Sequence, residues 1–302
     1  MTESRVAVML MSYGTPRTPD DILPYYTDIR RGRPPTDLQL AELTARYDAI
    51  GGISPLAERS EAQRTAMQAA LDKIAPARYH VTLGMKHAEP FIEQSVDDLA
   101  AQGFRRVVGL VLAPHYSAFS VGQYLDRLNK AASRHDIAAI GIESWATEPA
   151  FVEFVAAELR SKLAGLPGAT KVLFTAHSLP ERILETGDPY PAQLAATAAG
   201  VASAVGLDNW GLAWQSAGRT PEPWLGPDIL QVIDELAADG TTKAVLVSAV
   251  GFVADHLEVL YDLDIEACRR AADNGLEFAR TACVNDDPSV MAALAGRIAG
   301  AT

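Results

Sequence analysis

The sequence predicts an α/β protein made of two similar domains, each a parallel sheet flanked by helices. Apolar, β-branched runs alternate with stretches of helical periodicity, which is typical of parallel sheets covered on both faces. These runs fall into two groups of four, one in each half of the 302-residue chain. In addition, residues 106–128 can be laid over residues 243–265 by pattern, which places Tyr124 on Tyr261. A duplicated unit is the simplest interpretation.

Each candidate strand is a short apolar run bounded by polar or turn-forming residues. In chain order, the candidate strands are Arg5–Met11, Tyr79–Gly84, Arg106–Ala113, Ala138–Glu143, Lys171–Ala176, Trp210–Gln215, Lys243–Val250 and Leu276–Ala282. Helices are expected between them, because parallel strands need helical crossover connections.

Several helix starts and stops can be read from the sequence. Thr36 and Gln39 form a capping-box pattern ahead of an apolar face that ends at the glycines of residues 51–52. Ser60 and Gln63 repeat the pattern and predict that another helix starts there.

The two predicted domains comprise residues 1–147 and residues 148–302. Pro149 marks the first turn of a long helix that joins the halves. Ligands of open α/β sheets bind at the carboxyl ends of the strands, so functional side chains are expected there.

Composition excludes several classes of protein. Hydrophobic residues make up 48% and charged residues 21%, which is typical of a globular, soluble chain and not of a disordered one. The formal net charge of −12 disfavours nucleic acid and anionic membrane as partners. The apolar run near the N-terminus lacks a basic flank, and no segment is long enough to span a bilayer. We therefore expect a cytoplasmic protein.

Common catalytic signatures are absent from the sequence. There is no GxGxxG after a strand, no GxxxxGK[ST], no GxSxG and no HExxH. This argues against dehydrogenases, P-loop NTPases, α/β-hydrolases and zincins. Cys268 and Cys283 are too few for a disulfide framework or a four-thiolate metal site.

Histidines gather at the predicted strand ends. Four of the six follow a strand within a few residues: His87, His115, His177 and His256. The clearest case is His177, because it ends the apolar run VLFTA and precedes Ser178 and Pro180. Its ring is expected to project into a crevice, although a histidine at such a position can also simply hydrogen-bond a loop carbonyl.

An acidic series follows the seventh strand. On a helix, Glu258, Asp262 and Glu266 are four residues apart and lie along one face, where their charges repel one another. Such a series can be a solvated acidic stripe. Leading towards a histidine, it can also be a path for a divalent metal, with mixed nitrogen and oxygen ligands that suit Fe²⁺, or a path for protons.

Basic and aromatic residues complete the candidate site. Arg30, Arg31 and Arg33 form either a local anion site or an exposed basic turn, and Arg46 and Ser54 follow nearby in sequence. The aromatic residues near these positions are Tyr13, Tyr25, Tyr26, Tyr47, Phe119, Tyr124 and Trp224. Together these residues predict a cleft with aromatic walls, an arginine rim and a His/Glu metal end. Such a cleft suits a flat, apolar ligand with several carboxylates.

Long motifs throughout the chain resemble those of ferrochelatases. They are YGTP, YYTDIRRGR, YDAIGGISPLA, MKHAEPFI, LAPHYSAFSVGQY, AHSLPERI, GDPYP, WQSAGRTPEPWLGPD and VGFVADHLEVLYDLD. The resemblance is strongest to the soluble bacterial type that metallates coproporphyrin III. It implies two Rossmann-like domains around a porphyrin cleft, a last helix that packs across the domains, Fe²⁺ as substrate and no organic cofactor.

The resemblance also implies roles for residues that match these motifs. His177 and Glu258 would form the catalytic metal-site pair, with their division of labour between iron and protons left open. Tyr13 would approach the other porphyrin face and serve as axial ligand to the product iron. The porphyrin would contact Tyr13, Arg30, Arg31, Arg46, Tyr47, Ser54 and Tyr124. Asp262 and Glu266 would hold a second, hydrated divalent ion such as Mg²⁺.

Several alternatives remain at this point. The substrate could instead be protoporphyrin IX, or the protein could be a non-catalytic porphyrin or haem carrier. An iron–sulfur cluster, which some relatives carry on four cysteines, is not expected with two cysteines. The polar stretch at residues 30–46 lacks the apolar lip of membrane-attached relatives. We expect a monomer that makes transient contacts with neighbouring enzymes of haem synthesis.

Overall fold

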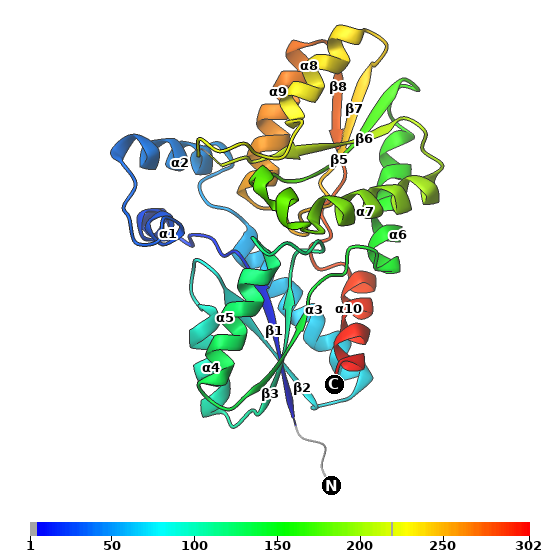
Figure 1. Cartoon of the computed structure of the whole chain (residues 1–302). Coiled ribbons are helices and arrows are strands. Elements are labelled where there is room, and N and C mark those ends of the chain that lie inside the picture. The colour runs from blue at the N-terminus through cyan, green and yellow to red at the C-terminus, as the bar shows by residue number, and fades with distance from the viewer. Residues whose placement is uncertain (1–4, 219) are drawn as a thin grey trace.

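The computed structural model describes residues 5–218 and 220–302 (Figure 1). Residues 1–4, and Arg219 within the motif WQSAGRTPEPWLGPD, lie outside the described residues. The first sheet contains β1 (Val6–Ser12), β2 (Tyr79–Met85), β3 (Arg106–Val111) and β4 (Ala138–Ile142). The second contains β5 (Thr170–His177), β6 (Trp210–Gln215), β7 (Ala244–Ser248) and β8 (Glu277–Arg280). Each predicted strand is confirmed, with ends shifted by a few residues.

Both sheets are parallel and have the same strand order. The first runs β2-β1-β3-β4 and the second runs β6-β5-β7-β8. In each sheet the chain continues to opposite sides after the two central strands, which opens a crevice at their carboxyl ends. The repeated order confirms two similar, Rossmann-like α/β units. It also confirms the alignment of residues 106–128 with residues 243–265, because β3 and β7 take the same place in their sheets.

Helices cover both faces of each sheet. They are η1 (Pro19–Asp21), α1 (Ile22–Ile29), α2 (Asp37–Ala49), α3 (Leu56–Ile74), α4 (Ile92–Ala101), α5 (Val121–Ser133), α6 (Pro149–Leu163), η2 (Glu181–Thr186), α7 (Tyr190–Val205), α8 (Ile229–Asp239), η3 (Glu258–Ala267), α9 (Cys268–Asp273) and α10 (Pro288–Gly300). Among them η1 and η2 are 3-10 helices and η3 is a π-helix. None of the helices in the described residues is long and apolar enough to cross a membrane.

Strand β1 shows how one apolar run is buried on two faces. Val8 and Leu10 pack in a core cluster with residues of α3 and α10, whereas Met9 and Met11 pack in a second cluster with residues of α4 and α5. Alternate side chains of a strand point to opposite faces, so a continuous apolar run is needed here. The second sheet is buried in the same way, with α8, η3 and α9 on one of its faces.

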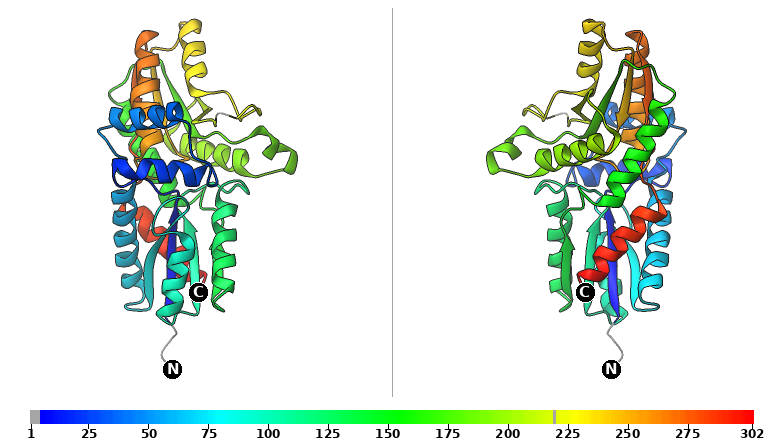
Figure 2. Two further views of the ribbon diagram at one scale, coloured as in Figure 1. Left: turned by 90° about the vertical axis from the view of Figure 1, so that its left-hand side faces the viewer. Right: turned by 90° about the vertical axis from the view of Figure 1, so that its right-hand side faces the viewer.

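The C-terminal helix α10 packs against helices from both halves of the chain. It lies beside α3 and also touches α6 (Figure 2). The side-chain amide of Gln63 in α3 donates to the carbonyl oxygen of Asn285 at 2.8 Å, which ties α3 to the segment that precedes α10. The domain boundary between residues 147 and 148 stays a prediction.

One helix start was predicted correctly and another was not. Thr36 caps α2 and forms the predicted capping box with Gln39. Helix α3, however, begins at Leu56, so Ser60 and Gln63 lie inside it and are fully buried. The preceding Pro55 is the N-cap residue, and proline has no N–H to be satisfied at such a position. The prediction of a start at Ser60 was therefore wrong.

Candidate active site

A cavity of about 560 Å³ lies between the two units. Its wall is formed largely by residues that follow the central strands β1, β3, β5 and β7, the place where open α/β sheets bind ligands. Six of the predicted site residues line it: Tyr13, Tyr47, Ser54, Tyr124, His177 and Glu258. Aromatic side chains supply much of the remaining wall, as the sequence predicted.

Two glycines allow the backbone at this wall to pack closely. Gly14 has a φ of 87°, and a Cβ atom there would lie 2.8 Å from the Cβ of Ala88. A Cβ atom on Gly251 would lie 2.4 Å from the Cβ of Ala176 in β5. Only glycine fits without displacement at either point. The loops that carry Tyr13 and Glu258 can therefore approach the neighbouring strand ends.

His177 is the last residue of β5 and faces the cavity. Its Nδ1–H donates to the carbonyl oxygen of Ser178, because a carbonyl oxygen can only accept. In the neutral ring, the lone pair is then on Nε2, which lies 3.8 Å from Oε1 of Glu258. The phenol of Tyr190 donates to the carbonyl oxygen of His177 at 3.0 Å and fixes the strand end. The ring thus makes a loop hydrogen bond and still presents Nε2 to a ligand.

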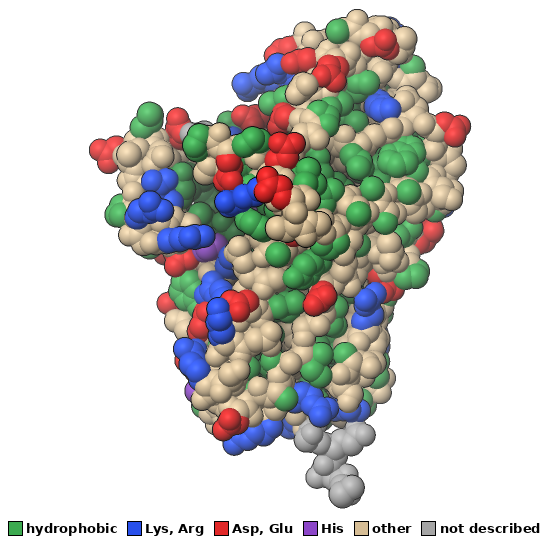
Figure 3. Space-filling model, viewed as in Figure 1, with side chains coloured by type: hydrophobic (Ala, Val, Ile, Leu, Met, Phe, Trp, Pro, Cys, Tyr) green, Lys and Arg blue, Asp and Glu red, His purple; other side chains and the backbone are tan. Residues whose placement is uncertain are grey.

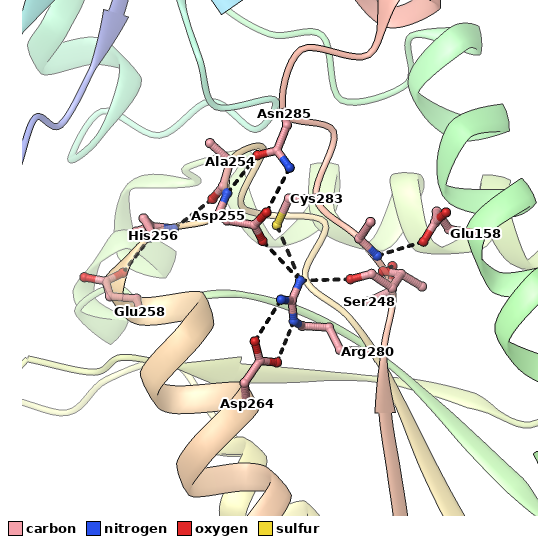
Figure 4. A network of polar contacts seen from close by, with 12 residues as sticks. Glu158, Ser248, Ala254, Asp255, His256, Glu258, Asp264, Arg280, Cys283 and Asn285 are labelled. Carbon is pink, nitrogen blue, oxygen red and sulfur yellow. Dashed lines mark hydrogen bonds and ion pairs between the residues drawn. The ribbon is translucent and has the colours of Figure 1, made fainter. Parts of the chain in front are cut away.

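Glu258 is the first residue of η3 and lies between two imidazoles. His256 donates from Nδ1 to the carbonyl oxygen of Ala254 at 2.9 Å, and its Nε2 lies 3.7 Å from Oε2 of Glu258 (Figure 4). The side-chain amide of Gln215 donates to the backbone carbonyl oxygen of Glu258 at 3.2 Å. His256 was not among the predicted site residues, although its place after β7 was a usable signal.

The two imidazoles keep Glu258 ionised. Burial alone would raise the pKa of Glu258, but the charges that His177 and His256 carry when protonated, helped by Arg46, outweigh it and lower this pKa to about 2. No group of three or more His, Cys, Asp or Glu side chains among the described residues could enclose a metal ion. An ion that meets Glu258 and His177 would therefore take further ligands from water or substrate.

Tyrosines of the first unit form the other wall. Tyr13 follows β1 and is 40% exposed, with its ring centroid 4.5 Å from that of His87. Tyr47 of α2 and Tyr124 of α5 are almost fully buried. Burial raises the pKa of the Tyr47 and Tyr124 phenols, that of Tyr47 to about 12, so both stay neutral at physiological pH. Ser54 lies beneath them and accepts a hydrogen bond from the backbone N–H of Leu56.

Lys86 is a cavity residue that the sequence analysis did not assign. It follows β2 and lies 5.1 Å from the ring centroid of Tyr124 and 5.9 Å from that of Tyr13. Its ammonium group donates to Oε1 of Gln123 at 2.7 Å, a neutral partner. Burial, together with the charges of Arg127 and Arg31, lowers the pKa of Lys86 to about 8. A cation with a neutral partner in a cavity suits an anionic ligand group.

The structure does not bring the predicted arginines into the cavity wall. Arg30 ends α1, where its Nε donates to the carbonyl oxygen of Arg33 and its guanidinium lies over the ring of Tyr26. Arg31 is exposed and has a φ of 57°. Figure 3 shows basic side chains gathered over α1 and the segment after it. They lie outside the cavity in this structure.

The predicted acidic face is part of the π-helix η3, which is wider than an α-helix. Arg46 of the first unit reaches across to it, with Nη1 3.4 Å from Asp262 and Nη2 3.7 Å from Glu266. The hydroxyl of Ser216 also donates to Asp262. Burial and the charge of Glu258 nevertheless raise the pKa of Asp262 to about 6. Arg46 therefore does not fully neutralise these carboxylates.

The fold is similar to that of solved chelatase structures. The sirohydrochlorin chelatase SirB from Bacillus subtilis subspecies spizizenii, in complex with cobalt, matches with a TM-score of 0.60 at 11% identity, over 98% of this chain and 95% of that chain. CbiX, the terminal enzyme of sirohaem biosynthesis in denitrifying bacteria, matches with a TM-score of 0.57 at 15% identity, over 99% of both chains. Identities this low show a shared fold only.

Sequence comparison then gives the family: the chain belongs to the ferrochelatases. The ferrochelatase family model matches residues 5–301. A ferrochelatase of Herpetosiphon aurantiacus is 43% identical over 95% of both chains. A coproporphyrin III ferrochelatase of Geobacillus kaustophilus is 42% identical over 98% of this chain and 95% of the relative. The protein is therefore a lyase, with Fe²⁺ and a porphyrin as substrates and no organic cofactor.

Proposed function

We propose that the protein inserts Fe²⁺ into coproporphyrin III and so forms iron coproporphyrin in haem biosynthesis. The observation that carries this proposal is the paired Nε2 of His177 and carboxylate of Glu258, 3.8 Å apart, on the wall of an aromatic cavity. Several relatives at about 40% identity, among them those of Geobacillus kaustophilus and Halalkalibacterium halodurans, are coproporphyrin III ferrochelatases.

The His177–Glu258 pair suits a metal that must arrive and then leave. A neutral imidazole and a carboxylate are good ligands for Fe²⁺, and their number is too small to retain it. Insertion also releases two pyrrole protons, which need a base near the ring. Because its lowered pKa makes Glu258 a weak base, His177 and His256 are the better acceptors for them in this part of the cavity.

The tyrosine wall supplies the binding energy for the macrocycle. A porphyrin is flat and apolar, so stacking against Tyr13 and burial near Tyr47 and Tyr124 favour its entry. Energy from contacts away from the metal can be used to bend the ring and turn its nitrogen lone pairs towards the ion. We propose Tyr13 of this wall as the axial ligand of the product iron.

Lys86 is our candidate partner for a substrate propionate. The variant Lys86→Gln is expected to raise KM for coproporphyrin about tenfold with little change in kcat, because one charge-assisted hydrogen bond is lost. In the wild type, kcat/KM should fall as pH rises through about 8, where Lys86 loses its charge. In Lys86→Arg this fall should move to higher pH. Steady-state kinetics across pH 6.5–9.5 measure both effects.

Lys130 provides the matched control for this prediction. It is an exposed lysine on α5 whose ammonium group lies 2.7 Å from Asp126, outside the cavity. Lys130→Gln should leave both KM and the pH profile unchanged. A KM in Lys86→Gln that equals the wild-type value would exclude Lys86 as the propionate partner.

We also propose a second, hydrated divalent ion such as Mg²⁺ at Asp262 and Glu266. Carboxylate oxygens are the ligands that Mg²⁺ prefers, and the hydroxyl of Ser216 adds another oxygen beside Asp262. The raised pKa of Asp262 supports a need for more positive charge than Arg46 supplies. Arg46 would either stay paired with the two carboxylates beside the ion or move away so that they can bind it.

With two cysteines in the whole sequence, we propose that no iron–sulfur cluster is present.

Thermal unfolding tests the second ion without measuring activity. Mg²⁺ is expected to stabilise the wild type by about 1–3 kcal/mol at concentrations well above its Kd. The double variant Asp262→Asn with Glu266→Gln should lose this response, and its metal-free form should melt higher because buried charge is removed. Asp234→Asn in α8, where this side chain is 45% exposed, is the control that should keep the Mg²⁺ response. An undiminished Mg²⁺ response in the double variant contradicts the proposal.

The carrier alternative predicts different behaviour with metal-free porphyrin and Fe²⁺. An insertion enzyme converts many equivalents of porphyrin, whereas a carrier binds one equivalent and stops. A protoporphyrin IX ferrochelatase would also turn over but would prefer the dicarboxylate substrate. Steady-state comparison of the two porphyrins therefore separates all three functions.

A further inference from the structure

We infer that Arg280 is a positioning residue that holds Glu258 in place by fastening the π-helix η3 and the loop before it to the end of β8. This inference rests on the proposed function, since it concerns the geometry of iron insertion. Arg280 is the last residue of β8, and its side chain is only 14% exposed. It makes no contact with the main cavity.

The guanidinium of Arg280 joins two segments that bracket Glu258 (Figure 4). Its Nε and Nη2 donate to the two carboxylate oxygens of Asp264 at 2.8 and 2.9 Å. Its Nη1 donates to Oδ1 of Asp255 at 3.4 Å and to the carbonyl oxygen of Thr281 at 3.0 Å. Asp255 precedes Glu258 by three residues and Asp264 follows it by six, so one side chain restrains both sides.

Asp255 extends the network towards the first unit. Its backbone N–H donates to Oδ1 of Asn285 at 3.0 Å, and Nδ2 of Asn285 donates to its carboxylate at 2.9 Å. The carbonyl oxygen of Asn285 in turn accepts from Gln63 at 2.8 Å. The loop that carries His256 and Glu258 is therefore tied through Arg280 to one unit and through Asn285 to the other.

Packing on this side does not replace the ion pairs. A second cavity of about 410 Å³ is lined by Asp255, Asp264, Arg280 and Lys162. π-Helices are rare, and a cavity beside a helix leaves that side of it with fewer packing contacts. Without Arg280, both carboxylates would also be left next to each other without their shared cation. Loss of the guanidinium should therefore move η3 and with it Glu258.

The variants Arg280→Gln and Asp264→Asn test this role. Each should lower kcat/KM for Fe²⁺ about tenfold to hundredfold, because a shift of about 1 Å in a reacting group has effects of this size. The Kd for coproporphyrin, measured by fluorescence quenching without metal, should stay within threefold of wild type. Arg280→Lys keeps the charge but not the bidentate geometry of the guanidinium. It should therefore retain kcat/KM for Fe²⁺ only in part. Asp264→Asn guards against misfolding of Arg280→Gln, because Asp264 is 38% exposed.

The pair of Arg270 and Asp234 provides the matched control. It is an ion pair of 2.8 Å in the same unit, between α9 and α8, and it does not touch the loop before η3. Arg270→Gln should destabilise the fold without changing the kinetics for Fe²⁺. Hydrogen exchange gives a readout independent of activity: residues 255–264 should exchange faster in Asp264→Asn and not in Arg270→Gln.

The outcomes separate this inference from the proposed function. Normal Fe²⁺ kinetics and normal exchange in folded Asp264→Asn would overturn the positioning role while the enzyme remains a ferrochelatase. Faster exchange in a protein whose wild type inserts no iron into coproporphyrin would show that Arg280 restrains η3, but would overturn the proposed function and with it a positioning role in iron insertion.

Discussion

Replacing His177 with alanine is expected to lower kcat for iron insertion about 1,000-fold, within the range that a positioned acid–base group or ligand contributes. The Kd for coproporphyrin should change less than tenfold. Binding depends mainly on the tyrosine wall and on Lys86, whereas Nε2 of His177 faces Glu258, 3.8 Å away. Stopped-flow absorbance for turnover and fluorescence quenching for binding measure the two quantities separately.

His135 is a suitable control for this variant. It is a histidine of the first unit that lies outside the cavity, where its Nε2 is 2.6 Å from Asp97. His135→Ala should insert iron at the wild-type rate. If His177→Ala loses binding and turnover to the same degree, His177 holds the porphyrin and not the metal, and its assigned role is wrong.

We also expect a large effect on substrate choice. The value of kcat/KM should be about a hundredfold higher for coproporphyrin III than for protoporphyrin IX. Coproporphyrin has four propionates where protoporphyrin has two propionates and two vinyl groups. A hydrogen bond to a charged group contributes about 1.5–3 kcal/mol, so two further contacts account for a factor of this size. Lys86 is one partner in the cavity wall, and Ser54 is placed to be another.

The arginines of the rim contribute to this preference only if they move towards the bound substrate. Arg30 and Arg31 lie outside the cavity wall, and Arg46 is paired with Asp262 and Glu266. Both porphyrins are to be compared as monomers in detergent. Lys86→Gln should reduce the ratio of kcat/KM for coproporphyrin III to that for protoporphyrin IX. Lys130→Gln should leave this ratio unchanged. Equal kcat/KM for the two porphyrins would refute coproporphyrin specificity and leave the ferrochelatase reaction itself untouched.

Local sequence signals predicted the strands and the location of the site. The apolar runs that became β1, β3, β5 and β7 are buried on both faces, so their composition carries the signal without alternation. Parallel sheets bring the residues after these strands to one edge. His177 and Glu258 could therefore be assigned to one cleft although 81 residues separate them in the chain.

Contacts between distant segments could not be predicted in this way. Arg46 pairs with Asp262 across 216 residues. Arg280 donates two hydrogen bonds to Asp264, which lies in a π-helix where the sequence indicated an ordinary helix. Lys86 lies in the motif MKHAEPFI at a predicted strand end, but the sequence did not show that its side chain would reach the cavity beside Tyr124. The false start at Ser60 arose because a capping-box pattern also fits two polar residues inside a helix, where they are buried by packing against other segments.

Iron insertion into coproporphyrin III at the His177–Glu258 site can be measured directly. The most direct measurement is an anaerobic reaction of the wild type with Fe²⁺ and a large excess of metal-free coproporphyrin III, followed by the loss of porphyrin fluorescence. We expect steady conversion of many equivalents per protein, about 1,000-fold slower in His177→Ala and retained in His135→Ala. Loss of a single equivalent followed by a plateau, or turnover that is unchanged in His177→Ala, would contradict this expectation.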